Sequence, residues 1–412
     1  MGNLFKIAIR NLRRYRRRTI LTSSLVAIGV IFVLVFVGIS GSFKNMIIGQ
    51  MTDSMLGHIQ VHQKGYMASI DNLPLTMNMK QQAVKKLEKV FHDIPDIESY
   101  SPRIKFGGMF SSFTETTNIR LNGVYPAMEM KTLPLLASRI SNGGKEIKKG
   151  EIVIPELLSR GMKVKVGDTI VVIATNKDGS VNGKQLKVSG TIESVTGPGG
   201  RDGYVHIEDA MEILRMDEME ISEIAIRLKD FGKLNDAYNA LNTMLSDEVN
   251  KQGKPAFEVH TWEGLSPFYN VARMIDIMTI FIKVMLIAIV LISVMNVMIM
   301  AVYERIREIG TIAAIGTMPG KILSMFMIEG FLLGIIGAIA GNILGAGIVY
   351  LLKVARITFS FGRQADLVLS PYVTLQDIAM ISLIVIIVAI LGSLQPAFKA
   401  SRMEPIKALR HV

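Results

Sequence analysis

The fold is decided first by one uncharged run, Ile20-Leu-Thr-Ser-Ser-Leu-Val-Ala-Ile-Gly-Val-Ile-Phe-Val-Leu-Val-Phe-Val-Gly-Ile-Ser-Gly41. Three further runs of similar character cover residues 284–302, 330–352 and 378–398. A helix needs about 20 mainly apolar residues to cross the hydrocarbon core of a membrane, where its backbone groups must bond to each other. Four such runs in a chain with a mean hydropathy of +0.37 argue against buried helices of a soluble protein. The sequence therefore predicts four membrane-spanning helices.

The basic residues predict which way these helices run. The first 19 residues contain seven Lys and Arg and no acid, and cationic flanks are retained on the cytoplasmic side. Four crossings return the C-terminus to that side, where residues 399–412 carry four Lys and Arg against one acid. The first run is longer than the apolar part of a signal peptide and has no cleavage motif, so we expect a retained anchor. The net charge of +11 then fits anionic lipid better than nucleic acid.

The chain lacks the residue patterns of common catalytic and metal centres. It contains no Cys and six His, which excludes disulfides, thiolate chemistry and Cys-ligated zinc. It has no P-loop, no Gly-x-Ser-x-Gly and no His-Glu-x-x-His motif. His58 and His62 share one face of an expected strand, but no third ligand is evident nearby, and we expect both on the surface. We therefore expect no catalytic residue, metal or cofactor in this chain, while a hydrolase that uses only carboxylates stays open.

The segment between the first two runs is long enough for one large domain or two small ones. Strand-like and helix-like pieces alternate in it, which predicts an α+β domain with a second part, about 125–217, inserted in the first. The expected order is a basic cytoplasmic N-terminus (1–19), the first membrane helix with an outward stalk (20–56), the outer domain (57–267), a stalk with the second membrane helix (268–302), a cytoplasmic helix (303–321), the third membrane helix (322–352), a short outer loop (353–372), the fourth membrane helix (373–398) and a cytoplasmic tail (399–412).

The cytoplasmic segment begins Tyr303-Glu-Arg-Ile-Arg-Glu-Ile-Gly310. Ile306, Ile309 and Ala313 fall on one side of a helix, and the charged residues fall on the other. Two glycines permit a tight reversal or the close approach of another surface. We expect a short helix at the membrane surface that either docks on a protein or only anchors the loop.

A second candidate contact lies in the outer domain. Asp178-Gly179 and Asn182-Gly183 stand between two strand-like runs, and both dipeptides favour the positive φ angles of tight turns. We expect a protruding hairpin over residues 175–184, which either contacts a partner or is an ordinary solvated loop.

Two motifs resemble those of a known family. They are Glu304-Arg-Ile-Arg-Glu-Ile-Gly310 followed by Ala314-Ile-Gly316, and the tail Gln395-Pro-Ala-Phe-Lys-Ala-Ser-Arg-Met-Glu-Pro-Ile-Lys-Ala-Leu-Arg410. With its four-span layout, the chain resembles over its whole length the MacB/LolC-LolE/FtsX class of ABC transporter permeases. The resemblance implies an outer domain of the MacB periplasmic core type, a location in the bacterial inner membrane, and two permease protomers, identical or different.

The resemblance also implies a separate ATPase subunit that binds ATP and Mg. In this class ATP hydrolysis moves the outer domains like levers, a mode called mechanotransmission. The ATPase would dock on residues 303–315, which then form a coupling helix. The residues expected to couple the two subunits are Tyr303, Glu304, Arg305, Arg307, Glu308, Gly310, Ala314 and Gly316.

Gly57-His-Ile-Gln-Val-His-Gln-Lys-Gly-Tyr66 and Gly203-Tyr-Val-His-Ile-Glu-Asp-Ala210 look closest to the lipoprotein-releasing LolC/LolE branch. This implies that lipoprotein, or another hydrophobic substrate, leaves the outer leaflet of the inner membrane, with a periplasmic carrier as a further partner. The LolC hairpin that recruits the carrier is rich in proline, and residues 175–184 contain none, so an LolE-like or homodimeric permease is equally consistent. The resemblance is also compatible with a MacB-like exporter of peptides or drugs, and with an FtsX-like scaffold that regulates a cell-wall hydrolase.

A hydrophobic cargo needs an adaptable apolar surface, and Met side chains are flexible and polarisable. Such residues occur on the outward extension of the first span and at the start of the second, where they either enclose cargo or pack the two stalks together. They are Phe43, Met46, Ile47, Met51, Phe268, Met274 and Met278.

Overall fold

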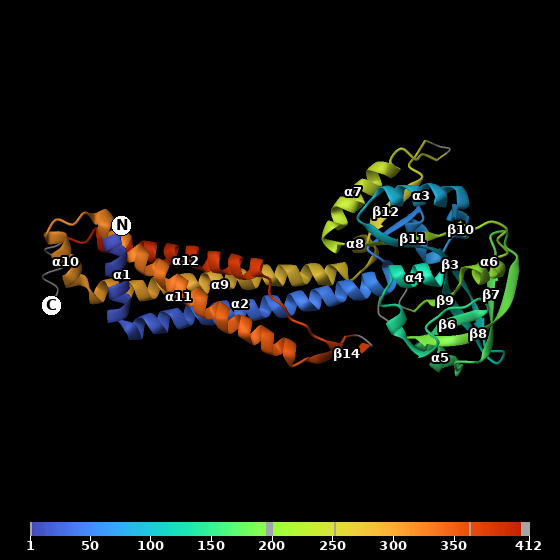
Figure 1. The fold of residues 1–412 in the computed structure, drawn as a ribbon, viewed down its shortest axis with the longest axis horizontal. Helices are drawn as coiled ribbons and strands as arrows, with labels where there is room; N and C mark the ends of the chain where they lie inside the picture. The colour runs from blue at the N-terminus through green and yellow to red at the C-terminus, as the bar shows by residue number, and fades with distance from the viewer. Residues whose placement is uncertain (1, 195–200, 251–252, 362–363, 405–412) are drawn as a thin grey trace. The chain divides into compact units, whose positions relative to one another are not determined.

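A computed structural model describes residues 2–194, 201–250, 253–361 and 364–404 of the chain. Its contacts divide the protein into two compact units (Figure 1). The helical unit contains the chain up to Asn45, Arg273–Phe359 and the chain from Val368 onward, and the domain unit contains Met46–Ala272 and Ser360–Leu367. Each unit has its own apolar core.

Four helices in the described parts of the chain are long and apolar enough to cross a membrane. They are α2 (Arg16–Met51), α9 (Tyr269–Glu304), α11 (Pro319–Val354) and α12 (Leu375–Ser401). The predicted four-span layout is therefore confirmed. α2 continues into a short π-helix, η1 (Thr52–Leu56), well past the end of the uncharged run at Gly41.

Glycines allow the membrane helices to approach closely. A Cβ added at Gly341 of α11 would lie 2.6 Å from the Cβ of Val30 on α2. A Cβ added at Gly330 of α11 would lie 2.5 Å from the Cβ of Ser393 on α12. Helix packing in membranes depends on such small residues, because lipid removes the hydrophobic driving force between helices. α11 therefore packs directly against both α2 and α12.

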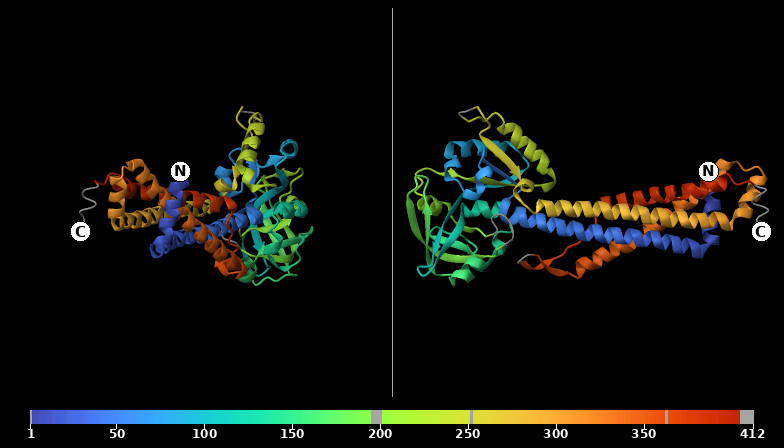
Figure 2. Two further views of the ribbon diagram at one scale, coloured as in Figure 1. Left: turned by 60° about the vertical axis from the view of Figure 1, so that its left-hand side comes forward. Right: turned by 180° about the vertical axis from the view of Figure 1, so that it is seen from behind.

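Two short helices lie at one end of the helical unit (Figures 1 and 2). α1 (Gly2–Arg14) precedes α2 and packs on α11, and α10 (Ile306–Ala314) links α9 to α11. We call this the α1–α10 end. The opposite end is where α2 and α9 connect to the domain unit through the chain.

The domain unit is built on one mixed sheet. Ten strands of the described chain join it, in the order β12-β1-β11-β3-β4-β9-β6-β8-β5, with β7 pairing to β3 and β8. They are β1 (Ile59–Gln63), β3 (Ile97–Ser111), β4 (Thr116–Val124), β5 (Ile140–Gly143), β6 (Glu151–Pro155), β7 (Thr169–Thr175), β8 (Val181–Ile192), β9 (Gly203–His206), β11 (Glu223–Leu228) and β12 (Phe257–Thr261). Two small sheets pair β2 (Met79–Lys80) with β10 (Glu220–Ile221), and β13 (Thr358–Phe361) with β14 (Gln364–Val368).

Helices cover this sheet with apolar faces. α3 has the amphipathic pattern expected for a surface helix, and its buried residues are Val84, Leu87 and Phe91. The helices are α3 (Gln81–Asp93), α4 (Pro126–Thr132), α5 (Glu156–Met162), α6 (Ile207–Ile213), α7 (Leu234–Leu245) and α8 (Trp262–Leu265), with short 3-10 turns at Met67–Asn72, Leu75–Met77, Ala137–Arg139 and Phe231–Lys233.

Residues 125–217, expected as an inserted part, continue the same sheet. β4 pairs in parallel with β9, and β9 pairs with β6, so these strands extend the sheet instead of forming a separate one. They also have a small apolar core of their own, which includes Leu133, Leu136, Ile192 and Tyr204. The domain unit is thus one α+β structure with a main core and a smaller second core.

His58 and His62 are both buried, and the expectation that they lie on the surface is wrong. β1 is an inner strand between β12 and β11, and residues on both of its faces are buried. In the described ranges, no group of three or more His, Cys, Asp or Glu is placed to hold a metal ion. The two histidines therefore belong to the core.

The hairpin turn is shorter than the two turn-forming dipeptides suggested. Asn182 and Gly183 lie within β8, where they pair with β7, so only Asp178-Gly179 belongs to the turn. Gly179 has a φ of +86°, and the Asp178 carboxylate accepts a hydrogen bond from Ser180 N at 3.0 Å. Strand pairing outweighed the local turn preference of Asn-Gly.

Candidate functional site

α10 and the residues after it present an exposed apolar tip. Ile309 and Gly310 are buried against the core of the helical unit. On the outward side, Ile315 is 80% exposed and Met318 is 67% exposed, on either side of Gly316 with a φ of +92°. Large apolar side chains that gather on a surface mark a site of contact with another protein or a membrane. We call Ile315 and Met318 the apolar tip.

The residues predicted to couple the chain to an ATPase fall into two groups. Six of the eight are exposed, namely Tyr303, Glu304, Arg307, Glu308, Ala314 and Gly316. The two acids are paired within the chain, because Glu304 Oε2 lies 3.1 Å from Arg18 Nη1 and Glu308 Oε1 lies 3.3 Å from Arg14 Nη1. The other two, Arg305 and Gly310, are buried. The structure thus brings this segment against the basic N-terminal segment.

A buried ion pair holds the start of α10. Arg305 Nη1 donates to Glu329 Oε1 at 2.8 Å, and the two side chains are 2% and 1% exposed. Asn11 Nδ2 of α1 donates to the same oxygen at 2.8 Å. The guanidinium carbon of Arg305 also lies 4.6 Å from the centre of the Tyr15 ring, within the range of a cation–π contact. This Arg305–Glu329 cluster joins α1, the α9–α10 junction and α11.

Sequence reasoning missed Asn11, Tyr15 and Glu329. Glu329 directly precedes the uncharged run that begins at residue 330, and it lies inside α11. An acid within an expected membrane helix is costly and marks a functional or paired residue, which is the signal that would have found it. Asn11 and Tyr15 carry no comparable signal, because a helical pattern does not reveal tertiary neighbours.

A cavity of about 630 Å³ lies between α1, α10 and α11. It is lined by Ile7, Arg10, Asn11, Arg14, Arg305, Glu308, Ile309, Thr311, Ile312 and Met325. Three Arg and one Glu give this lining a positive balance, and isoleucines supply apolar surface. We call it the α1–α10 groove. Together with the apolar tip, it makes this end of the helical unit the candidate site for a protein partner.

The residues predicted to contact cargo divide between the two units. In the domain unit Ile47 and Met51 are buried and Met46 and Phe268 are half-buried, whereas in the helical unit Phe43 is half-buried and Met274 and Met278 are exposed. Met51 belongs to a small apolar cluster with Met55 and Leu56, on which Leu265 and Phe268 pack, so this side chain contributes to the packing of the domain unit. Of these seven side chains, only Met274 and Met278 are exposed over half of their surface and are therefore open to contact with another molecule.

The end of the stalk is bonded into the domain unit. Leu135 N donates to Asp53 O of η1 at 3.0 Å. The buried Arg139 donates to Ser54 O at 2.9 Å and to a second carbonyl at 2.8 Å. Asp53 also forms an ion pair with Arg227. Because a guanidinium is planar and holds its acceptors in a fixed geometry, these contacts fix η1 against the rest of the domain unit.

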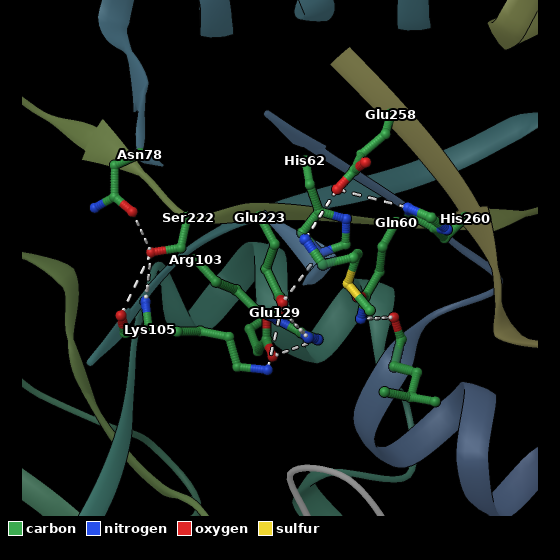
Figure 3. Close-up of polar contacts among 12 residues, drawn as sticks. Gln60, His62, Asn78, Arg103, Lys105, Glu129, Ser222, Glu223, Glu258 and His260 are labelled. Carbon is green, nitrogen blue, oxygen red and sulfur yellow. Dashed lines mark hydrogen bonds and ion pairs between the residues drawn. The ribbon is translucent and has the colours of Figure 1, made fainter. Parts of the chain in front are cut away.

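A buried charge cluster joins three elements of the domain unit (Figure 3). Arg103 of β3 lies 2.8 Å from Glu223 of β11 and 2.9 Å from Glu129 of α4. Lys105 of β3 lies 3.3 Å from Glu223. Burial by itself raises the pKa of Glu223, but Lys105 and the other neighbouring groups hold that pKa well below its ordinary value. The carboxylate stays ionised and paired, so the cluster stabilises the sheet and offers no free base or nucleophile.

Comparison with known proteins gives two family matches. A family described as MacB-like periplasmic core domain matches residues 19–244, and one described as FtsX-like permease C-terminal matches residues 280–405. The motif over residues 304–316 lies within the second match. The end of the tail motif, residues 405–410, lies outside the described residues.

Three curated relatives show how far the similarity extends. The chain is 25% identical over 311 residues to the lipoprotein-releasing system transmembrane protein LolC of Xylella fastidiosa, covering 71% of this chain and 72% of that one. It is 22% identical over 431 residues to LolC of Neisseria meningitidis serogroup B, covering 98% of each chain. It is also 22% identical over 422 residues to a probable export ATP-binding/permease protein MacB of Pseudomonas entomophila, covering 98% of this chain and 58% of that one.

Proposed function

Because the chain belongs to the MacB, LolC and FtsX type of ABC transporter permeases, we propose that it extracts lipoproteins, or another hydrophobic substrate, from the outer leaflet of the inner membrane. The membership confirms the predicted family, and the match over residues 19–244 confirms the predicted type of outer domain. The chain is a membrane-spanning permease of the inner membrane, and its family implies an ATPase partner and a dimer. The similarity to LolC over 98% of each chain supports lipoprotein as the substrate class.

The observation that carries this proposal is the bonded end of the stalk. α2 is one helix from Arg16 to Met51 and continues into η1, whose Asp53 and Ser54 are bonded to the rest of the domain unit. A movement of α2 in the membrane would therefore be passed to the domain by a continuous helix and not by a flexible linker. ATP-driven closure of the partner would do work on the outer domain in this way, which is mechanotransmission.

In this proposal the α1–α10 end faces the cytoplasm. Its basic N-terminal segment satisfies the positive-inside rule, and both termini then lie on the cytoplasmic side. The ATPase, which binds ATP and Mg, docks on the apolar tip and the α1–α10 groove. On the other side of the membrane, the turn at Asp178-Gly179 is the proposed contact for a periplasmic carrier.

Reconstitution tests the substrate class. The full chain and its ATPase are placed in proteoliposomes that contain an acylated lipoprotein, and a soluble carrier is added outside. We expect ATP-dependent transfer of lipoprotein to the soluble fraction, and none with an ATPase variant that binds but does not hydrolyse ATP. Absence of transfer in the complete system would contradict the proposal.

A second candidate is export of peptides or drugs, favoured by the match to the MacB-like periplasmic core domain. The same vesicles distinguish the two, because an exporter would move a peptide or drug and leave the lipoprotein in the membrane. ATP-dependent activation of a cell-wall hydrolase, with neither substrate moved, would instead identify a signalling scaffold.

A further inference from the structure

At the edge of the second apolar run lies a charged side chain that has no partner among the residues that the structure describes. Lys283 of α9 directly precedes residues 284–302 and is half-buried. Over the ranges that the structure describes, its ammonium group makes no hydrogen bond or ion pair. An ionisable side chain in a membrane helix is costly unless a partner stabilises it, so such a residue marks a binding site and calls for its partner to be named.

Lys283 lines a polar cavity within the helical unit. The cavity has a volume of about 270 Å³ and lies between α2, α9 and the residues at the start of α12. Val37 and Ser40, near the end of the uncharged run of α2, line it too, so the cavity extends alongside the end of the apolar segment. Hydroxyl groups of Ser40, Thr279 and Tyr372 add possible hydrogen-bond partners.

Two cationic and two anionic side chains line the cavity. One cation and one anion pair with each other, and in the part of the chain that the structure describes the other two do not. Lys44 Nζ lies 2.7 Å from both carboxylate oxygens of Asp276, so these two charges neutralise each other. Asp377 accepts hydrogen bonds from Thr374, through its backbone N at 3.1 Å and its hydroxyl at 2.6 Å, and no cation pairs with it in the described chain. Within the described residues, one cation, Lys283, and one anion, Asp377, therefore line the same cavity without an ionic partner.

We propose that this cavity binds the headgroup of a zwitterionic phospholipid, with the phosphate bonded to Lys283 and the ammonium group bonded to Asp377. A separate cation and anion match a phosphoethanolamine headgroup, which carries one charge of each sign. An anionic phospholipid would satisfy Lys283 but leave Asp377 without a cation. Hydrogen bonds between ionised groups are the strongest polar contacts available for such recognition. The lipid is a resident of the permease and not its cargo, so its binding does not depend on which substrate is transported.

Lipid retention by the purified full chain tests this site. The protein is extracted from vesicles of equal phosphatidylethanolamine and phosphatidylglycerol content, and retained lipids are counted by native mass spectrometry. The wild type should retain more phosphatidylethanolamine than phosphatidylglycerol. Lys283→Met should lower its retention about tenfold, as expected for the loss of one charge-assisted hydrogen bond, and Lys283→Arg should keep most of it. Asp377→Asn should abolish the preference over phosphatidylglycerol while phospholipid is still bound.

Lys353→Met is the matched control, because Lys353 of α11 is exposed near the same end of the helices and does not line the cavity. Thermal stability of each variant is measured with and without added phosphatidylethanolamine, which should stabilise the wild type, Lys283→Arg and Lys353→Met fully and Lys283→Met least. Asp377→Asn should be stabilised equally by phosphatidylethanolamine and phosphatidylglycerol. Equal retention by the wild type and Lys283→Met would overturn the proposal. Variants that lose stability equally with and without lipid would show instead that Lys283 and Asp377 pair with each other.

Discussion

Arg305 and Glu329 carry two charges that solvent scarcely reaches, and each depends on the other. Removal of one partner leaves the other charge buried and unpaired. We expect Glu329→Ala to lower the free energy of unfolding by about 3–5 kcal/mol, seen as a lower melting temperature of the full chain in detergent. Arg305→Met combined with Glu329→Met removes both charges and should restore most of the stability. A melting temperature unchanged by Glu329→Ala would show that the pair does not stabilise this end.

The buried carboxylate of Glu223 predicts that the stability of the outer domain depends on pH. Its pKa in the folded chain lies well below the ordinary value of 4.5, so the ionised carboxylate stabilises the fold above that value. This stabilisation is lost as the pH falls through the folded-state pKa. Glu223→Gln should therefore be less stable than the wild type at neutral pH, and the difference should shrink as the pH falls below 4.5. Urea unfolding of both full-length chains at a series of pH values measures this stability difference. A difference that stays constant with pH would contradict the lowered pKa of Glu223.

At the scale of the element, we propose that the apolar tip after α10 forms part of the ATPase contact, because Ile315 and Met318 are large apolar side chains that are mostly exposed. Ile315→Asp should reduce binding of the ATPase at least tenfold, because it places a charge in an apolar contact, while the exposed position leaves the fold intact. Co-purification of the ATPase with the variant measures the effect. Val181→Asp, at another exposed aliphatic position, on β8 of the domain unit, is the control and should bind normally. Normal ATPase binding by Ile315→Asp would place the docking surface elsewhere.

The close packing of α11 on α2 leads to a second prediction for an element. Gly341→Ala introduces a methyl group 2.6 Å from Val30 Cβ, whereas the same change at Gly347 meets nothing within 4 Å. We expect Gly341→Ala to destabilise the helical unit by about 1–3 kcal/mol and Gly347→Ala to have no such effect. Melting temperatures of the two variants in detergent provide the comparison. Equal melting temperatures of the two variants would mean that α2 can shift away from the added methyl group with little loss of stability.

For the whole molecule, the bonded stalk should decide whether ATP hydrolysis performs work outside the membrane. Arg139→Met removes the hydrogen bond to Ser54 O, so η1 is held less firmly, through the contacts of Asp53 with Leu135 and Arg227. We expect normal assembly and ATP hydrolysis but at least a severalfold loss of substrate transfer in proteoliposomes. Arg160→Met, a change on the exposed surface of α5, is the control. Full transfer by Arg139→Met would indicate that force reaches the domain by another route.

The candidate site was only partly predictable from the sequence. The motif and its glycines located the short helix between the second and third spans, and the apolar row predicted its buried side. Glu304 and Glu308 are predicted to contact a partner and are exposed, and the structure adds their pairing with Arg18 and Arg14, which are far away along the chain. Periodicity identifies the residues that share a helix face, and it does not identify the surface that this face meets.

The sequence by itself determined the four spans, the α+β class of the outer domain and the family. A membrane helix satisfies its backbone hydrogen bonds within its own segment, so its presence follows from local composition. The tertiary structure alone decided the burial of His58 and His62, the inclusion of Asn182 and Gly183 in β8, and the pairing of Arg305 with a Glu on another helix. A strand bonds to neighbours from distant parts of the chain, and a buried charge takes its partner from another element, so neither outcome can be read from a local pattern.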